Sequence, residues 1–86
     1  MYKSLDSIHK DMRKVLEAVR DEKFSLSELR ANNKDVEIDE AIYACIEEKL
    51  ITGINAGRSA ETGHIMFYPS ENIKITYKGL SFLETH

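Results

Sequence analysis

The sequence lacks several patterns that mark particular classes of protein. Its single cysteine, Cys45, excludes an intrachain disulfide and fits a reducing cytoplasm. No apolar run approaches the roughly 20 residues that a membrane-spanning helix needs. The first ten residues, MYKSLDSIHK, contain no apolar core of a signal peptide. We therefore expect a cytoplasmic protein without a membrane segment.

Residues typical of catalytic or metal sites are also sparse. His9, His64 and His86 lie far apart, and no Cys or His stands at zinc-ligand spacing. The segment GINAG (53–57) lacks the Lys-Ser/Thr pair and the following helix of a phosphate-binding loop. Cys45 falls on the apolar stripe of a predicted helix, where a free cysteine is usually a core residue. The sequence thus predicts a protein that is not an enzyme and has no metal or cofactor.

Length and charge limit the number of domains and the kinds of binding partner. With 86 residues and no repeat or linker, the chain is expected to form one domain, 1–86. The net charge is −3, whereas nucleic-acid-binding domains are usually basic. Residues 1–34 hold eight Lys/Arg and six Asp/Glu, a balance of +2, and residues 35–86 hold four and nine, a balance of −5. Any nucleic-acid surface would draw on the first part of the chain or on a local patch.

Three- and four-residue spacing of apolar side chains predicts three helices in the first half of the chain. The first has the stripe Ile8, Met12, Val15, Leu16 and Val19. The second follows a capping box, Ser25 to Glu28, turns Leu26 and Leu29 inward and ends at Asn32–Lys34. The third begins between Val36 and Asp39, and its stripe is Ile38, Ala41, Ile42, Cys45, Ile46 and Leu50.

After Leu50 the pattern becomes β-branched and is interrupted by glycine. ITGINAGR (51–58) and HIMFYP (64–69) predict two strands joined by the turn-rich SAETG, with Pro69 closing the second. ENIKI (71–75) is expected to be extended. Thr76 then caps a last helix, YKGLSFLE (77–84), anchored by Leu80 and Leu83. If Phe82 and Tyr2 both lie outside the core, the termini are expected to form a homodimer face.

The order helix, helix, helix, hairpin, helix predicts an α+β fold of the winged-helix type, with a three-helix core, a two-stranded wing and a short C-terminal helix. AIYACIEEKLITGI resembles a third helix that runs into the first wing strand, with Gly53 at the crossing. ITYKGLSFLE resembles the closing motif of small bacterial winged-helix proteins. The chain is similar to the YjcQ-like family of Gram-positive bacteria and their phages. This resemblance implies a DNA-binding or regulatory module and supplies no catalytic residue.

The third helix is a poor candidate for direct contact with DNA bases. A helix-turn-helix protein presents the start of this helix to the major groove, where Arg, Lys, Asn and Gln bind bases best. The exposed positions here are expected to be Asp39, Glu40, Tyr43, Glu47 and Glu48. Carboxylates on this face of the helix would be repelled by the phosphates that line the groove. A solvated acidic face is therefore preferred, and docking of a basic protein is the other alternative.

Residues beside the third helix are better candidates for DNA contact. Arg30, Asn33 and Lys34 belong to the turn before it, and Arg58 and His64 belong to the wing. Together with Tyr43, these six positions form the predicted nucleic-acid surface. Two hypotheses remain open at this point. One is a winged-helix regulator that binds double-stranded DNA, and the other is a protein-interaction module that uses the acidic third helix.

Overall fold

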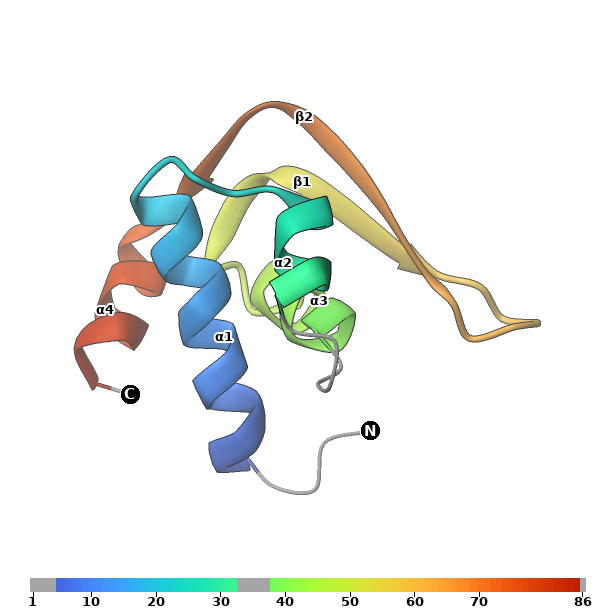
Figure 1. The fold of residues 1–86 in the computed structure, drawn as a ribbon, viewed down its shortest axis with the longest axis horizontal. Coiled ribbons are helices and arrows are strands. Elements are labelled where there is room, and N and C mark those ends of the chain that lie inside the picture. Colours follow the sequence, from blue (N-terminus) through green and yellow to red (C-terminus); the bar gives the residue numbers. More distant parts are fainter. Residues whose placement is uncertain (1–4, 33–37, 86) are drawn as a thin grey trace.

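The computed structural model describes residues 5–32 and 38–85, apart from the side chains of residues 69–71. It contains four helices and a two-stranded antiparallel sheet, which confirms the predicted α+β class. The elements follow in the order α1 (Leu5–Arg20), α2 (Leu26–Asn32), α3 (Ile38–Glu47), β1 (Ile51–Arg58), β2 (Ile65–Ile75) and α4 (Tyr77–Thr85). The helices gather into one body, and the hairpin of β1 and β2 reaches away from it (Figure 1). This arrangement is compatible with a winged helix.

The core lies where α1, α3 and the start of β1 meet. Its buried residues include the predicted stripes of α1 and α3 apart from Ile8 and Ile46, which are half-buried, and Cys45 is fully buried among them. The complete set is Met12, Val15, Leu16, Val19, Ile38, Ala41, Ile42, Cys45, Leu50, Ile51, Ile54 and Leu83. Leu26 and Leu29 of α2 are half-buried against this cluster.

Ile46 and Leu80 also differ from their predicted positions in the core. Ile46 packs against the core but is only half-buried, because α3 ends at Glu47 and turns into β1. Leu80 is 41% exposed, since α4 turns Gly79 and Leu83 inward and leaves Leu80 on its outer side. Phe82 is half-buried and its ring meets His9 edge-on at 5.2 Å, so it does not offer the free aromatic face that the dimer hypothesis required. Tyr2 lies outside the described residues.

The end of α3 is closed by a left-handed residue. Lys49 has φ of 59°, its amide donates to the Ile46 carbonyl at 3.0 Å, and the Leu50 amide donates to the Cys45 carbonyl at 2.9 Å. This pair of bonds is a Schellman motif, which satisfies the last carbonyls of a helix and reverses the chain. It places Leu50 in the core and starts β1 immediately afterwards.

The hairpin differs from the prediction in its second half. The segments 64–69 and 71–75 are one strand, β2, and Pro69 lies inside it opposite Ile54. Proline is tolerated there because each strand of a two-stranded sheet has an edge on which no amide is needed. The pairing shifts between Thr52 and Ile54, where one β1 residue faces a longer stretch of β2.

Gly53 makes this irregularity possible. Its φ is +86°, in the region that favours glycine, and a Cβ added there would lie 1.9 Å from the backbone oxygen of Asn72. The glycine was expected at the crossing from helix to strand. It instead lies inside β1, where it lets the backbone of β2 approach closely.

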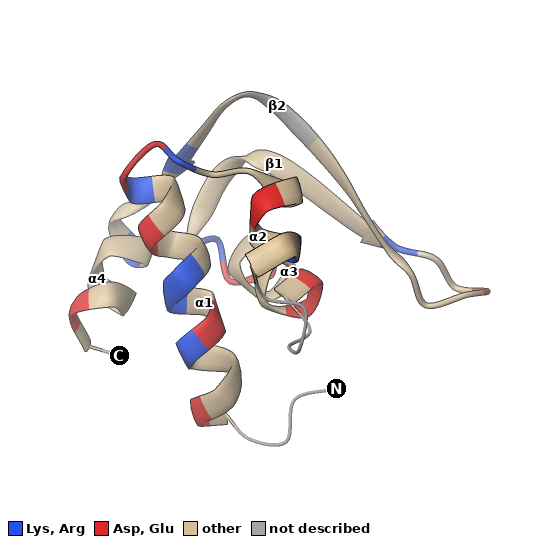
Figure 2. Cartoon of the chain, viewed as in Figure 1, with Lys and Arg blue, Asp and Glu red and all other residues tan. Residues whose placement is uncertain are grey.

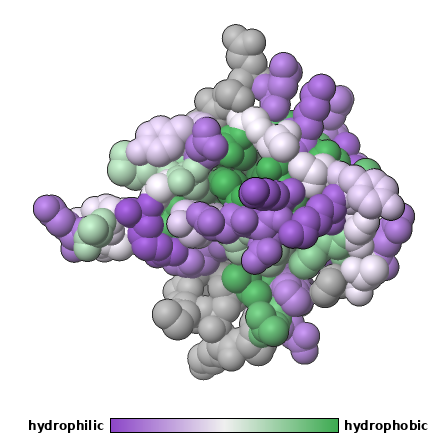
Figure 3. Space-filling view, turned by 180° about the vertical axis from the view of Figure 1, so that it is seen from behind, coloured by the Kyte–Doolittle hydropathy of each residue, from purple (hydrophilic) through white to green (hydrophobic). Residues whose placement is uncertain are grey.

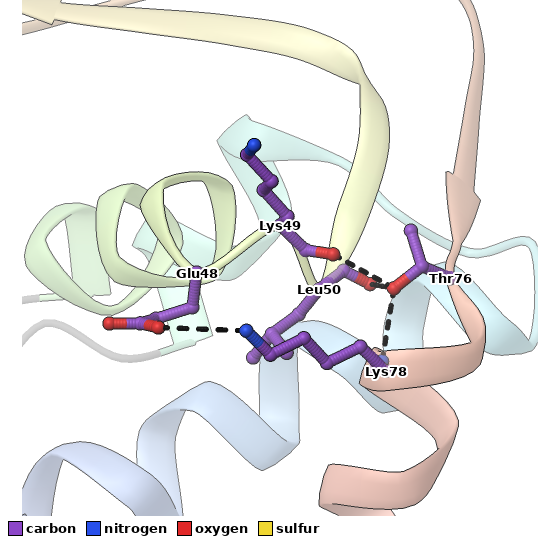
Figure 4. A network of polar contacts seen from close by, with 6 residues as sticks. Glu48, Lys49, Leu50, Thr76 and Lys78 are labelled. Carbon is purple, nitrogen blue, oxygen red and sulfur yellow. Dashed lines mark hydrogen bonds and ion pairs between the residues drawn. The ribbon is translucent and has the colours of Figure 1, made fainter.

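Thr76 joins the start of α4 to the corner between α3 and β1 (Figure 4). The Thr76 hydroxyl lies 2.9 Å from the Lys49 carbonyl and 3.0 Å from the Leu50 carbonyl, and it accepts the Gly79 amide at 3.0 Å. A Cβ on Gly79 would lie 2.3 Å from the Leu50 oxygen. The two residues of the closing motif therefore cap α4 and allow it to pack against the corner.

Candidate functional site

Three of the predicted site residues converge on the first two turns of α3. Arg30 comes from the end of α2, Arg58 from the end of β1 and Tyr43 from α3 itself. Arg30 and Arg58 meet adjacent residues of α3, Asp39 and Glu40. We call these five residues, together with Phe67 of β2, the arginine–carboxylate cluster.

Arg30 forms a two-pronged contact with Asp39. Its Nε donates to Oδ1 at 2.8 Å and its Nη2 donates to Oδ2 at 3.1 Å. The guanidinium also lies over the ring of Phe67, 5.8 Å from the ring centre. The hydrogen bonds to Asp39 raise the pKa of Arg30. Arg30 thus connects α2 to α3 and to the hairpin.

Arg58 contacts the next residue of α3, Glu40, through a single hydrogen bond. Its Nη2 donates to Glu40 Oε2 at 2.8 Å, its Nη1 donates to the Gly63 carbonyl at 3.1 Å, and its guanidinium lies 5.1 Å from the centre of the Tyr43 ring. The hydrogen bond to Glu40 raises the pKa of Arg58. Arg58 therefore connects the end of β1 and the hairpin loop to α3.

Tyr43 makes one contact through its ring and another through its hydroxyl. Its ring lies under Arg58, and its hydroxyl is hydrogen-bonded to Glu47 one turn further along α3. That hydrogen bond is the main reason that the pKa of Tyr43 is raised. Glu47 is the hydrogen-bond acceptor for this phenol and remains exposed.

The last carboxylate of the region faces a lysine of α4. Glu48 Oε2 lies 4.0 Å from Lys78 Nζ, and both side chains are 65% exposed (Figure 4). Each of the four acids between Asp39 and Glu48 thus faces a partner, three of them a cation and Glu47 a phenol. The prediction of a merely solvated acidic face holds for Glu47 and Glu48 and is wrong for Asp39 and Glu40, which are half-buried and hold arginines.

The remaining predicted site residues do not join the cluster. His64 is exposed at the end of the hairpin loop, where its backbone carbonyl accepts the Ser59 amide at 2.9 Å. Asn33 and Lys34 lie outside the described residues. From the sequence, Asp39 and Glu40 were interpreted as unfavourable for DNA binding. They were not identified as partners of Arg30 and Arg58. The separations of 9 and 18 residues gave no local signal for these pairs.

Charge elsewhere on the molecule is mixed in sign. Lys/Arg and Asp/Glu alternate along α1, and acidic residues lie on α3 (Figure 2). On α1, Lys14 pairs with the buried Asp11 at 3.3 Å. Arg13 donates to the Leu83 carbonyl, which caps the end of α4. The face seen in Figure 3 is largely hydrophilic, with hydrophobic patches between the polar side chains.

Other chemical candidates are weaker than the cluster. No group of three or more His, Cys, Asp or Glu side chains suited to a metal ion occurs within residues 5–32 and 38–85. Burial raises the pKa of the Cys45 thiol to about 12, so it is not a nucleophile. A hollow of about 420 Å³ beside α1 is lined by polar side chains. Its lining residues are Asp6, His9, Lys10, Arg13 and Thr85.

No helix in the described part of the chain is long and apolar enough to cross a membrane. Searches against protein-family models, curated proteins and solved structures found no match to this chain.

Proposed function

We propose that this chain is a non-enzymatic winged-helix module of bacterial or phage origin that binds another protein in the cytoplasm. The contact surface is the arginine–carboxylate cluster together with the neighbouring exposed face of α3. The resemblance of the helix order, the α3–β1 corner and the Thr76–Gly79 motif to winged-helix proteins supports the fold part of this proposal.

The observation that carries the proposal is that both arginines beside α3 are already held by carboxylates of α3. Affinity for DNA depends on cations that neutralise phosphates, and Arg30 and Arg58 neutralise Asp39 and Glu40 instead. Arginine and aromatic residues are enriched at protein interfaces and supply much of their binding energy. The cluster stacks two arginines on Tyr43 and Phe67, which favours a protein partner.

Site-specific photo-cross-linking in cells of the native host tests this proposal. A photoreactive phenylalanine analogue in place of Tyr43 keeps an aromatic ring under Arg58, and the same analogue in place of Tyr77 is the control. Tyr77 lies on α4 and is 87% exposed, so it reports contacts that depend on exposure alone. We expect an adduct from position 43, absent at position 77, that nuclease leaves intact. A nuclease-sensitive adduct at position 43 would refute the proposal.

One observation favours a second candidate, binding of double-stranded DNA. Arg30 and Arg58 both contact the first turn of α3, which a helix-turn-helix places in the major groove. In this candidate function the arginines bind phosphates next to the groove. It requires that they leave Asp39 and Glu40, and the nuclease-sensitive adduct described above is the result that it predicts.

A further inference from the structure

The contact between Arg30 and Asp39 has the geometry that arginine uses for phosphate. Two nitrogens of one guanidinium meet two oxygens of one acid at 2.8 and 3.1 Å. Phosphate and carboxylate groups are both bound in this forked manner, and a planar guanidinium suits each of them. Asp39 therefore fills the position that a phosphate oxygen pair would take on Arg30. Glu40 does the same on Arg58 through a single bond of 2.8 Å.

Contacts other than the carboxylates also hold the two arginines in place. Arg30 lies over Phe67, and Arg58 lies over Tyr43 and donates to the Gly63 carbonyl. Aromatic faces attract guanidinium groups and restrict their motion. If the carboxylates were neutral, the arginines would still be oriented beside α3, and their charge would be available to another anion.

The carboxylate contacts are accessible to competitors. The side chains of Arg30 and Asp39 are 48% and 38% exposed, and those of Arg58 and Glu40 are 39% and 36% exposed. Ion pairs this exposed are screened by salt and contribute little to stability. They can therefore be opened without unfolding the domain.

We propose that Arg30 and Arg58 form a masked binding site for the phosphate backbone of duplex DNA, and that Asp39 and Glu40 keep it closed. The carboxylates of α3 then do more than repel DNA. They occupy the two arginines that would otherwise bind its phosphates. The proposal shares the winged-helix arrangement with the proposed function but does not need the protein partner.

The test compares the full-length wild type with an Asp39→Asn, Glu40→Gln double variant. Fluorescence anisotropy measures affinity for a labelled mixed-sequence duplex between about 50 and about 200 mM salt, the range over which phosphate contacts weaken strongly. Two released arginines should steepen the dependence of log K on log salt by about 1.8. The affinity of the double variant should therefore fall about twelve-fold more than that of the wild type over this range.

The matched control is Glu22→Gln with Glu84→Gln. Both residues are exposed and lie outside the cluster, and the control changes the net charge by the same amount. We expect it to behave like the wild type. Adding Arg30→Ala and Arg58→Ala to the Asp39→Asn, Glu40→Gln variant should abolish the gain. Circular dichroism confirms that each variant is folded.

Two results would overturn the proposal. One is a double variant that binds duplex no better than the wild type, and the other is an equal gain in the control, which would show that net charge alone matters. If the double variant does not fold, Glu40→Gln alone carries the test, since it releases only Arg58 and should add about 0.9 to the slope. Strong duplex binding by the wild type would count against the proposed protein-binding function, whereas the comparison between variants decides the masking.

Discussion

The guanidinium of Arg58 donates to Glu40 at 2.8 Å and lies over the ring of Tyr43, 5.1 Å from its centre. One residue at the end of β1 is thus bound by two residues of α3 that lie one turn apart. The contact fixes the hairpin against the helix and neutralises an acid that would otherwise repel phosphates. It gives the acidic first turn of α3 a structural role in addition to any role in binding.

Replacing Gly53 with alanine should destabilise the protein more than any other glycine-to-alanine change in the hairpin. A Cβ at this position would overlap the backbone oxygen of Asn72, and the residue has φ of +86°. We expect a loss of about 3 kcal/mol or more in the free energy of unfolding, measured by urea denaturation.

Gly63→Ala is the matched control for this change. Gly63 also has a positive φ, +75°, but nothing lies within 4 Å of an added Cβ. Gly63→Ala should lower the free energy of unfolding only by the backbone strain, about 1–2 kcal/mol. Equal losses in the free energy of unfolding for the two variants would contradict the close approach of Asn72 to Gly53.

Truncation of Ile42 and of Ile46 should give different results. Ile42 is fully buried, so Ile42→Ala should lower the free energy of unfolding by about 2–5 kcal/mol. Ile46 is half-buried at the end of α3, and Ile46→Ala should cost about 1 kcal/mol. Thermal denaturation of both variants measures the difference, and a larger loss for Ile46 would contradict the orientation of α3.

Thr76→Val should weaken the attachment of α4. It removes the hydroxyl that accepts the Gly79 amide and contacts the carbonyls of Lys49 and Leu50. Loss of such a cap costs about 0.5–2 kcal/mol. Thr76→Ser keeps the hydroxyl and should retain most of the stability in the same chemical-denaturation experiment. If the two variants are equally stable, the hydroxyl does not cap α4.

Cys45 should be inert in the native protein. Burial raises the pKa of its thiol to about 12, so at pH 8 almost none of it is thiolate, the reactive form. Labelling with a thiol reagent at pH 8 should be slow in buffer and rapid in denaturant, as followed by mass spectrometry. Rapid labelling of the folded protein would show that Cys45 is not in the core.

The local elements could be predicted from the sequence because their signals are local. The spacing of Met12, Val15, Leu16 and Val19 predicted the buried face of α1. One half of the predicted capping box is observed, as a hydrogen bond from the Glu28 amide to the Ser25 hydroxyl at 3.3 Å. Turn residues between 59 and 63 predicted the hairpin loop. These features depend on residues within a few positions of each other.

The features that were missed depend on residues far apart in the chain. Pro69 was expected to end a strand, but a two-stranded sheet leaves an edge on which proline fits. Leu80 has the spacing of a core residue, yet the tight contact of Gly79 with Leu50 sets the rotation of α4. The partners of Arg30 and Arg58 became apparent only when α2 and the hairpin were placed against α3.

The central claim is that the wild-type protein has its α3-side arginines occupied by its own carboxylates and is therefore a poor ligand for DNA. Fluorescence anisotropy of the wild type with a mixed-sequence duplex at about 50 mM salt tests this most directly, because even weak phosphate contacts are detectable there. We predict weak binding that Arg30→Ala and Arg58→Ala substitution does not change. Clear binding that weakens with salt and is lost on Arg30→Ala and Arg58→Ala substitution would contradict the claim.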